Sequence, residues 1–299
     1  MKNARIIPRL DIKGPNLVKG VCFEGLRVLG KPEEFARYYY EQGADELICI
    51  DVVASLYGRN SILDIIQKIS DEIFIPLTVG GGLRNAEDIK AVLRSGADRV
   101  VINTAAVLNP TLIREVSDKF GSSTIMVSIE AIKNSSGRYE AYIDYGREPS
   151  GLDVLKWAKQ AAKLGAGEII VHSVEKDGTG NGFDLDLTRL ISETVSIPVI
   201  ASGGAGKLED VFKILTEGKA DAVSLGSVLH YYYLATREKQ IDTFEEGNTE
   251  FLKEMDPLNN FKSKFELTSI TKIKEFLKRK NINCRFNTFE TSANEIYES

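Results

Sequence analysis

The sequence predicts a (β/α)8 barrel, a closed ring of eight parallel strands surrounded by helices. Three observations lead to this fold class: eight short apolar runs recur along the chain, amphipathic stretches separate them, and the second half repeats the first. Apolar runs without strict alternation are typical of parallel strands covered on both faces. A strand followed by a helix, eight times, is the pattern of this barrel, and 299 residues suit one barrel with additions.

The predicted strands follow one another at similar intervals. We expect them at residues 5–10, 46–50, 75–79, 99–102, 125–129, 168–171, 197–201 and 221–225. Helical periodicity between them is clearest at residues 32–42, 86–95, 152–164 and 208–217. Three residues are expected to precede and cap helices, namely Asn85, Asn109 with Pro110 after it, and Ser150.

An internal repeat supports this arrangement more strongly than local propensity does. Residues 77–88 align with residues 199–210 at an offset of 122, and residues 43–48 align with 165–170 at the same offset. Residues 6–11 align with 125–130 at an offset of 119. We therefore expect two half-barrels, at about residues 1–122 and 123–234, that together close one barrel.

The rest of the chain departs from this pattern. Residues 235–267 are charged and low in apolar periodicity, which indicates an insertion. Residues 268–280 place Ile270, Ile273 and Leu277 on one face and are expected to form the last outer helix. Residues 287–299 are polar and are expected to be a frayed tail of a single domain that spans residues 1–299.

Composition argues against several functional classes. The net charge is -5 and no block of lysine or arginine stands out, so we expect neither nucleic acid nor a membrane as a partner. No signal-like or membrane-spanning stretch is recognisable, which favours a cytoplasmic protein. The three cysteines lack metal-ligand spacing, and no metalloprotease, nucleotide-binding or nucleophile motif occurs. We therefore expect no metal and no cofactor.

Two glycine clusters predict two phosphate sites. Glycine allows backbone N–H groups to approach phosphate oxygens, and a following helix presents its positive N-terminal end. One cluster follows the third strand and the other follows the seventh, and each has polar or glycine companions at the end of the next strand. The residues are Gly81, Gly82, Asn103 and Thr104 in the first half, and Ser202, Gly203, Gly204, Gly226 and Ser227 in the second. Glycines at tight turns are the simpler explanation for either cluster alone, but two matched copies favour a substrate with a phosphate at each end.

Two acids occupy equivalent positions in the repeat. Asp11 follows the first strand and Glu130 follows the fifth, so both are expected at the mouth where this fold carries its catalytic groups. Two carboxyl groups on opposite sides of a substrate can divide general-acid and general-base catalysis. One such acid is as readily a loop cap, but the matched pair favours catalysis.

Other polar residues fall at both ends of the predicted barrel. Asp177 and Gly178 follow the sixth strand, where they could contact the substrate, while His172 either faces the mouth or is packed. At the opposite end, four charged residues begin strands: Arg5, Glu46, Arg99 and Glu168. Their residue types alone indicate a surface ring of ion pairs that adds little stability.

Six segments taken together resemble the cyclase subunits of imidazole glycerol phosphate synthases. These are residues 6–11, 18–21, 43–47, 76–82, 177–179 and 198–206. The similarity runs from residue 5 to about residue 230 and resumes in the last helix. The sister isomerase of histidine biosynthesis shares the half-barrel repeat but fits less well at residues 19–21 and 205–206.

The resemblance implies a specific activity. In this family a glutaminase partner docks on the bottom of the barrel, and its ammonia passes through the interior to a ribulosyl aminoimidazole carboxamide substrate with two phosphates. Ammonia adds, and the adduct is cleaved and cyclised to imidazole glycerol phosphate and an aminoimidazole carboxamide ribotide. By this resemblance Asp11 and Glu130 are the catalytic acids, and Lys19 and Asp51 lie around the substrate.

The resemblance also gives the bottom ring a role. Arg5, Glu46, Arg99 and Glu168 match the family's ammonia gate, and Asp98 matches a position near the partner interface. The ring would then control ammonia entry, in place of the surface ring that its residue types alone indicate.

Three positions depart from the family pattern. Glu130 replaces aspartate and adds one methylene, a displacement of roughly 1.5 Å, on the scale at which misplacement costs about a hundredfold in rate. Arg9 replaces a small cysteine, and Arg99 replaces a lysine. Two alternatives to the cyclase therefore stay open. One is a paralogue that supplies ammonia to a third, sugar-amidating enzyme of surface-polysaccharide (O-antigen) assembly, and the other is a non-catalytic ammonia conduit.

Overall fold

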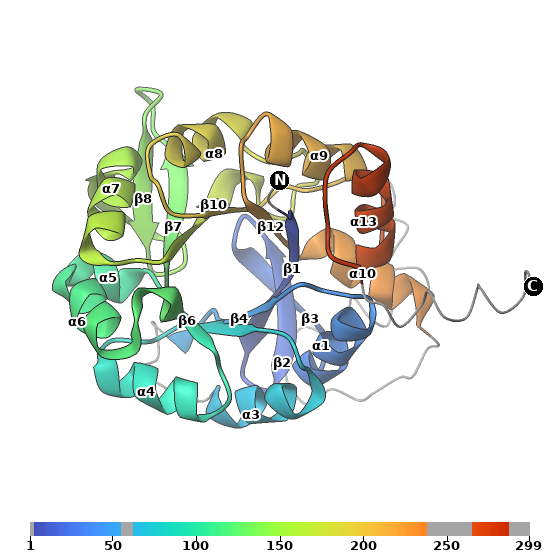
Figure 1. Cartoon of the computed structure of the whole chain (residues 1–299), viewed down its shortest axis with the longest axis horizontal. Coiled ribbons are helices and arrows are strands. Elements are labelled where there is room, and N and C mark those ends of the chain that lie inside the picture. Colours follow the sequence, from blue (N-terminus) through green and yellow to red (C-terminus); the bar gives the residue numbers. More distant parts are fainter. Residues whose placement is uncertain (1–2, 55–61, 238–264, 287–299) are drawn as a thin grey trace, which may run out of the picture.

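The computed structural model describes residues 3–54, 62–237 and 265–286, which fold into a closed parallel barrel (Figure 1). Going round the ring, each strand pairs in parallel with the next, and β12 pairs with β1 to complete it. The strands in ring order are β1 (Arg5–Lys13), β4 (Leu47–Asp51), β5 (Leu77–Gly80), β6 (Arg99–Ile102), β7 (Ile125–Lys133), β10 (Glu168–Ser173), β11 (Val199–Ser202) and β12 (Ala222–Leu225). The predicted (β/α)8 fold is confirmed.

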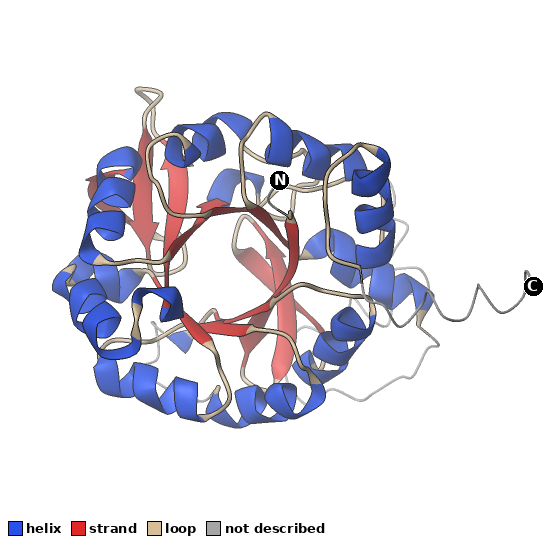
Figure 2. Ribbon diagram, in the orientation of Figure 1, coloured by secondary structure: helices blue, strands red, loops and turns tan. Residues whose placement is uncertain are grey.

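Helices cover the outside of the ring (Figure 2). They are α1 (Pro32–Glu41), α3 (Leu63–Glu72), α4 (Ala86–Arg94), α5 (Thr104–Leu108), α6 (Thr111–Phe120), α7 (Val154–Leu164), α8 (Leu185–Ser192), α9 (Leu208–Thr216), α10 (Ser227–Thr236) and α13 (Ile270–Arg279), with short 3-10 turns η1 (Ser122–Thr124) and η2 (Val174–Lys176). None of the helices in the described part of the chain combines the length and the apolar character needed to cross a membrane.

Two antiparallel hairpins were not predicted from the sequence. After β1 the chain forms β2 (Asn16–Val21) and β3 (Glu24–Gly30), and after β7 it forms β8 (Tyr139–Ile143) and β9 (Glu148–Asp153). Each hairpin pairs with the end of the strand before it, with Asp11 opposite Val18 and Glu130 opposite Tyr142. The hairpins therefore extend equivalent strands, β1 and β7, beyond the mouth of the barrel.

Two of the three predicted caps are wrong. Asn85 does cap α4, accepting hydrogen bonds from the backbone N–H groups of the next turn at 3.0 and 2.9 Å. Asn109 instead accepts from the Thr111 hydroxyl, and α6 begins after Pro110. Ser150 lies in β9, and Asp153 caps α7 because the hairpin delays the helix start.

Apolar side chains in the described residues form three buried clusters, and two of them build the body of the barrel. Between strands and helices lies the larger core, which includes Trp157 and Phe35, both almost fully buried. Inside the ring a smaller cluster crosses the barrel axis, made of Ile7, Ile48, Val101, Met126, Ile170, Ile200 and Ala222. The barrel interior is therefore packed with apolar side chains below the mouth, as this fold requires.

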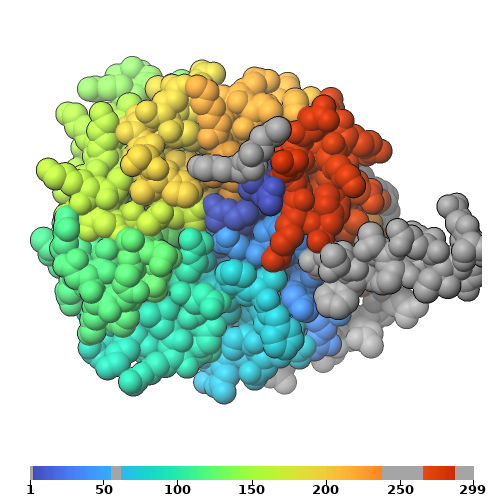
Figure 3. Space-filling view, viewed as in Figure 1, coloured from blue at the N-terminus to red at the C-terminus, as the bar shows by residue number. Residues whose placement is uncertain are grey.

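The last described helix returns to the start of the chain. The helix expected at residues 268–280 is α13, and just beyond it Cys284 forms a parallel bridge with Ala4. Figure 3 shows this end of the chain (red) beside the start of β1 (blue). Residues 238–264 of the predicted insertion and the predicted tail at 287–299 lie outside the described residues, and α10 extends to Thr236.

A buried ion pair attaches α13 to the barrel. The Lys274 ammonium lies 2.8 Å from Asp45 Oδ1 and donates to the Gly43 carbonyl at 2.7 Å, while the other Asp45 oxygen accepts from Ile6 N–H at 2.8 Å. Arg285 Nε is also 3.5 Å from Asp45. Removing one partner of a buried pair leaves the other charge without compensation.

We expect Lys274→Met to lower the free energy of unfolding by about 3 kcal/mol, because it leaves the buried Asp45 carboxylate with only the half-exposed Arg285, 3.5 Å away, as a cation partner. Urea denaturation followed by circular dichroism measures this. Arg279→Met on the exposed side of the same helix is the matched control and should change stability little. Equal effects of the two substitutions would show that the ion pair does not hold α13 in place.

Candidate active site

The two predicted catalytic acids lie at the mouth formed by the carboxyl ends of the strands. Asp11 is opposite Ile50 of β4, and Glu130 is opposite His172 of β10. Both are buried, with 2% and 7% of their surface exposed. Their strands, β1 and β7, lie on opposite sides of the ring. The two acids therefore border the same mouth from opposite sides, as the repeat predicted.

Asp11 belongs to a buried cluster of charges. Arg9 Nε donates to its Oδ1 at 2.8 Å, and Lys19 Nζ is 3.6 Å from its Oδ2. Lys19 in turn binds Asp177 at 2.6 Å. Burial alone would raise the pKa of Asp11, but the charges of Arg9 and Lys19 outweigh it and lower that pKa. Asp11 is therefore an anion held between two cations.

His172 extends the cluster on its other side. Arg9 Nη1 lies 2.6 Å from His172 Nδ1, and His172 Nε2 is 3.2 Å from Asp177 Oδ1. A guanidinium can only donate, so Nδ1 must accept and the ring is the neutral tautomer with its proton on Nε2. Burial, followed by the charge of Arg9, lowers the pKa of His172 to about 4. The sequence left His172 as either facing the mouth or packed, and the structure shows it buried in this cluster and also lining a cavity at the mouth.

Glu130 has a different environment. One carboxylate oxygen accepts a hydrogen bond from Gly146 N–H at 2.8 Å, in the turn between β8 and β9. Burial raises its pKa to about 7, and the charge of Arg9 only partly opposes this shift. Glu130 therefore exchanges its proton near neutral pH, whereas Asp11 stays ionised, and a raised and a lowered carboxyl together are suited to acid and base roles.

The larger cavity lies on the Glu130 side of the mouth. It has a volume of about 430 Å³, and its lining includes the predicted residues Asp51, Gly81, Gly82, Asn103 and Thr104 together with Glu130. Gly81 has φ +99°, and a Cβ there would be 2.2 Å from the Asp51 carbonyl oxygen. Only glycine fits at position 81, so no side chain there covers the backbone of the loop where it borders the cavity.

The smaller cavity lies on the Asp11 side. Its volume is about 20 Å³, and it is lined by the second predicted set, Ser202, Gly203, Gly204, Gly226 and Ser227, together with Lys19, Asp177 and Gly178. A Cβ on Gly178, whose φ is +68°, would be 2.6 Å from the Gly20 carbonyl oxygen. The structure thus groups the predicted phosphate residues into two sets, one on each side of the mouth.

Two aromatic side chains that sequence reasoning missed cover the charge cluster. Phe23 from the β2–β3 turn and Tyr145 from the β8–β9 turn are stacked with ring centroids 4.0 Å apart, and Arg9 lies 5.7 Å from the centroid of Phe23. The Tyr145 hydroxyl is 3.5 Å from Asp11 Oδ2. The internal repeat contained a signal for them, because Phe23 and Tyr145 come from equivalent turns in its two halves.

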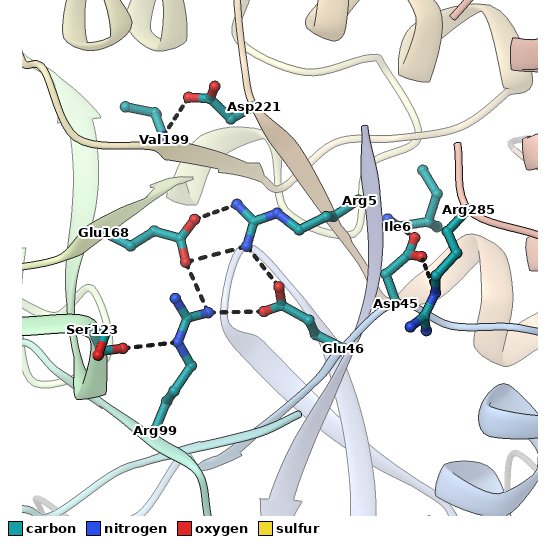
Figure 4. A network of polar contacts seen from close by, with 10 residues as sticks. All are labelled: Arg5, Ile6, Asp45, Glu46, Arg99, Ser123, Glu168, Val199, Asp221 and Arg285. Atoms are coloured by element: carbon teal, nitrogen blue, oxygen red, sulfur yellow. Dashed lines mark hydrogen bonds and ion pairs between the residues drawn. The ribbon is translucent and has the colours of Figure 1, made fainter. Parts of the chain in front are cut away.

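The charged ring at the opposite end closes the barrel bottom (Figure 4). Arg5 binds Glu46 at 2.7 Å and also binds Glu168, while Arg99 lies 3.0 Å from each of these carboxylates. Each arginine therefore bridges both glutamates across the axis. These are side chains of β1, β6 and β10 and of the residue before β4, so the ring connects elements from around the whole barrel.

Asp98 lies on the same end of the barrel. Its side chain accepts from Leu77 N–H at 2.9 Å, which fixes the start of β5. It also lines a cavity of about 380 Å³ beside Phe74, whose side chain is 83% exposed.

We expect Glu130→Gln to change how stability depends on pH. Folded Glu130 keeps its proton up to about pH 7, whereas the ordinary value for glutamate is 4.5. The unfolded state therefore binds fewer protons between these values, and the free energy of unfolding falls as pH rises through that window. The neutral amide has no such loss, so the stability of the variant relative to the native chain should increase by on the order of 2–3 kcal/mol from pH 4.5 to pH 8.

Urea midpoints measured across this pH range test the expectation. Glu115→Gln, an exposed position on α6, is the control and should give a curve parallel to that of the native chain. A Glu130→Gln curve that is also parallel would contradict the raised pKa.

Comparison with known proteins agrees with this geometry. The family model described as "Histidine biosynthesis protein" matches residues 5–234. A Legionella pneumophila protein named imidazole glycerol phosphate synthase subunit HisF is 56% identical over 210 residues, 70% of this chain and 99% of that protein. Proteins of the same name from Trichormus variabilis and a Nostoc species are 49% and 48% identical over 241 residues, 80% of this chain and 94% and 93% of theirs. The chain therefore belongs to the histidine biosynthesis protein family, among the HisF subunits of imidazole glycerol phosphate synthase.

Proposed function

We propose that this chain is the cyclase subunit of imidazole glycerol phosphate synthase and uses ammonia from a glutaminase subunit. Its product would be imidazole glycerol phosphate, released with an aminoimidazole carboxamide ribotide from a ribulosyl aminoimidazole carboxamide substrate with two phosphates. The observation that carries this proposal is the pair of unlike carboxyl groups, Asp11 and Glu130, each beside its own glycine-lined cavity at one barrel mouth. Membership of the HisF family supports the same activity.

The two cavities suggest how the substrate is held. Backbone N–H groups at Gly81 and Gly82, with the hydroxyl of Thr104 and the amide of Asn103, would bind one phosphate. The loops at Gly203 and Gly226, with Ser227, would bind the other. A substrate anchored at both ends would span the mouth, with its reacting centre between the two acids.

The acids would divide the proton transfers. Asp11, held as an anion by Arg9 and Lys19, would accept a proton from the nitrogen that ammonia contributes. Glu130, with a pKa of about 7, would donate its proton to the nitrogen on which the aminoimidazole product leaves. Asp51, which lines the larger cavity, would contact the substrate rather than transfer a proton.

Ammonia would enter from the opposite end. We place the glutaminase on the face that carries the ring of Arg5, Glu46, Arg99 and Glu168, next to Asp98 and the exposed Phe74. Ammonia must pass the ring before it reaches the apolar layer inside the barrel. Since each arginine bridges both glutamates, opening the ring requires at least one of these ion pairs to break.

The cyclase reaction tests the proposal directly. The purified chain, given ammonium salt and the bisphosphate substrate, should form imidazole glycerol phosphate. We expect Asp11→Asn and Glu130→Gln each to lower kcat by at least about a hundredfold, because each removes one proton-transfer group. Asp118→Asn and Glu115→Gln on the exposed side of α6 are the matched controls and should retain full activity.

If the native chain itself forms no imidazole glycerol phosphate, the proposal that it is a cyclase is rejected. Restoration of a sugar-amidation reaction when the chain is combined with an amidating enzyme would then favour the paralogue. Full pathway output from the Glu130→Gln chain would favour a conduit without chemistry of its own.

The ring has its own test. We expect Arg99→Ala to lower glutamine-driven activity several-fold while leaving ammonium-driven activity within about twofold, because ammonia would no longer be retained where it enters the barrel. Activity assays with each nitrogen source, in the presence of the glutaminase, give the ratio. Arg138→Ala, on the exposed turn between β7 and β8, is the control. If Arg99→Ala leaves the ratio of glutamine-driven to ammonium-driven activity unchanged, the ring has no role in ammonia delivery.

A further inference from the structure

One end of the Arg9 side chain is not used by the protein. Its Nε donates to Asp11 at 2.8 Å, and its Nη1 donates to His172 at 2.6 Å. Within the described residues Nη2 has no hydrogen-bond or ion-pair partner, and it is not among the fully buried polar atoms that lack one. Two N–H groups of a side chain that is only 6% exposed are therefore open to the mouth.

The guanidinium is held in one orientation. A planar group bound along two of its edges, to β1 through Asp11 and to β10 through His172, cannot rotate without losing both hydrogen bonds. Phe23 adds a third contact, with its ring centroid 5.7 Å from the guanidinium carbon. The free edge is thus fixed before any ligand arrives, as a group that stabilises charge in a reaction needs to be.

Arg9 lies between the two predicted phosphate sites. It lines the cavity that contains Gly81 and Gly82 and also the cavity that contains Gly203 and Gly204. In the proposed function each set of glycines binds one phosphate of the substrate. A substrate anchored at both ends has its middle part beside Arg9, so Nη2 is offered to the part of the ligand that reacts.

The proposed reaction develops negative charge in this middle part. The ribulosyl group is a ketose, and ammonia adds to its carbonyl carbon. The C–N bond forms while the π electron pair of the C=O bond moves onto the oxygen. A guanidinium stays protonated and only donates hydrogen bonds, so it is suited to bind that oxygen. Fixed donors aimed at a developing oxyanion in a buried site are among the largest contributions to catalysis.

The ion pair between Arg9 and Asp11 keeps charge balanced during this step. After addition the new nitrogen carries an extra proton, which passes to the Asp11 carboxylate. Asp11 becomes neutral as the oxygen becomes negative, so Arg9 exchanges one anionic partner for another and no buried charge is left uncompensated. Transfer of the same proton from Asp11 to the oxygen gives the neutral amino alcohol and restores the ion pair.

We propose that Arg9 is a further catalytic residue of this site. Its free Nη2 edge binds the carbonyl oxygen of the ketose part of the substrate and stabilises the negative charge that forms there when ammonia adds. The proposal rests on the proposed function, which supplies the ammonia and the ketose. The cysteine of the family pattern at this position has only a weak, uncharged donor.

Substitution of Arg9 should lower turnover far more than substrate binding. With ammonium salt we expect kcat of Arg9→Met and of Arg9→Cys to fall by about a hundredfold or more. Binding of the substrate, measured by isothermal titration without any nitrogen source, should stay within about threefold, because the contact strengthens only as charge develops. Arg94→Ala, an exposed position on α4, is the control. An unchanged or higher kcat in Arg9→Met or Arg9→Cys would overturn the proposal.

The pH profile separates this role from an effect through Asp11. Burial raises the pKa of Asp11 and the charge of Arg9 is the largest effect that lowers it, so Arg9→Met raises that pKa. If Arg9 acted only by keeping Asp11 ionised, kcat of the variant would approach the native value as pH rises. We expect the loss to persist at every pH, and full recovery would overturn the proposal. Besides Arg9, the groups that face Asp11 are Lys19, Cys49, Glu130, Tyr145, Asp177 and His230.

An anionic analogue tests the contact without the reaction. The carboxylate of erythronate 4-phosphate is as many carbons from its phosphate as the ribulosyl carbonyl is, and erythritol 4-phosphate is the matched alcohol. The native chain should bind the carboxylate about tenfold or more tightly than the alcohol, since a hydrogen bond to a charged group is the stronger one. Arg9→Met, with folding verified by circular dichroism, should lose this preference. Absence of the preference in the native chain would overturn the proposal whether or not the variant folds.

The outcomes distinguish this proposal from the proposed function. If the native chain forms product and Arg9→Met retains full kcat, the cyclase stands and the role of Arg9 fails. If the native chain forms no product, the cyclase fails and the addition step fails with it. The preference for erythronate 4-phosphate then still decides whether Arg9 binds an anionic oxygen of the ligand.

Discussion

Closure of the barrel is the constraint on which the site depends. The two predicted halves meet at the β6–β7 and β12–β1 pairs, and both pairs are parallel. Because all eight ring strands run the same way, their carboxyl ends meet at one mouth. Asp11 and Glu130 are far apart in sequence and come from different halves, so only this closure brings them to a common site.

Equivalent positions in the repeat have become chemically unequal. Asp11 and Glu130 each end a strand that continues into a hairpin, yet Asp11 lies between Arg9 and Lys19 while Glu130 accepts from the backbone of Gly146. The position equivalent to Arg9 at the offset of 119 is Ser128, which has no charge. Two cations on one side of the repeat, Arg9 and Lys19, therefore lower the pKa of Asp11, whereas burial raises the pKa of Glu130 to about 7 against the charge of Arg9.

The sequence predicted the ring and its mouth because periodicity and repetition depend on local pattern. It identified the strands to within a few residues, and it grouped Gly81 with Asn103 and Gly203 with Gly226. It missed the hairpins after β1 and β7, since their polar and mixed residues lack the apolar runs of buried parallel strands. The Phe23–Tyr145 stack followed from those hairpins and was missed with them. The contact of Arg9 with His172 joins residues 163 positions apart, which no local pattern contains.

Both ends of the barrel axis are occupied by arginines bound to carboxylates, with an apolar layer between them. At the bottom, Arg5 and Arg99 bridge Glu46 and Glu168, and at the mouth Arg9 binds Asp11. A charged species such as ammonium would lose its hydration in the apolar layer. Neutral ammonia has a much smaller desolvation cost. In the proposed function, the apolar layer therefore favours passage of neutral ammonia, which is the form that can add to a substrate carbon, and the Asp11 carboxylate would accept a proton from that nitrogen once it has added.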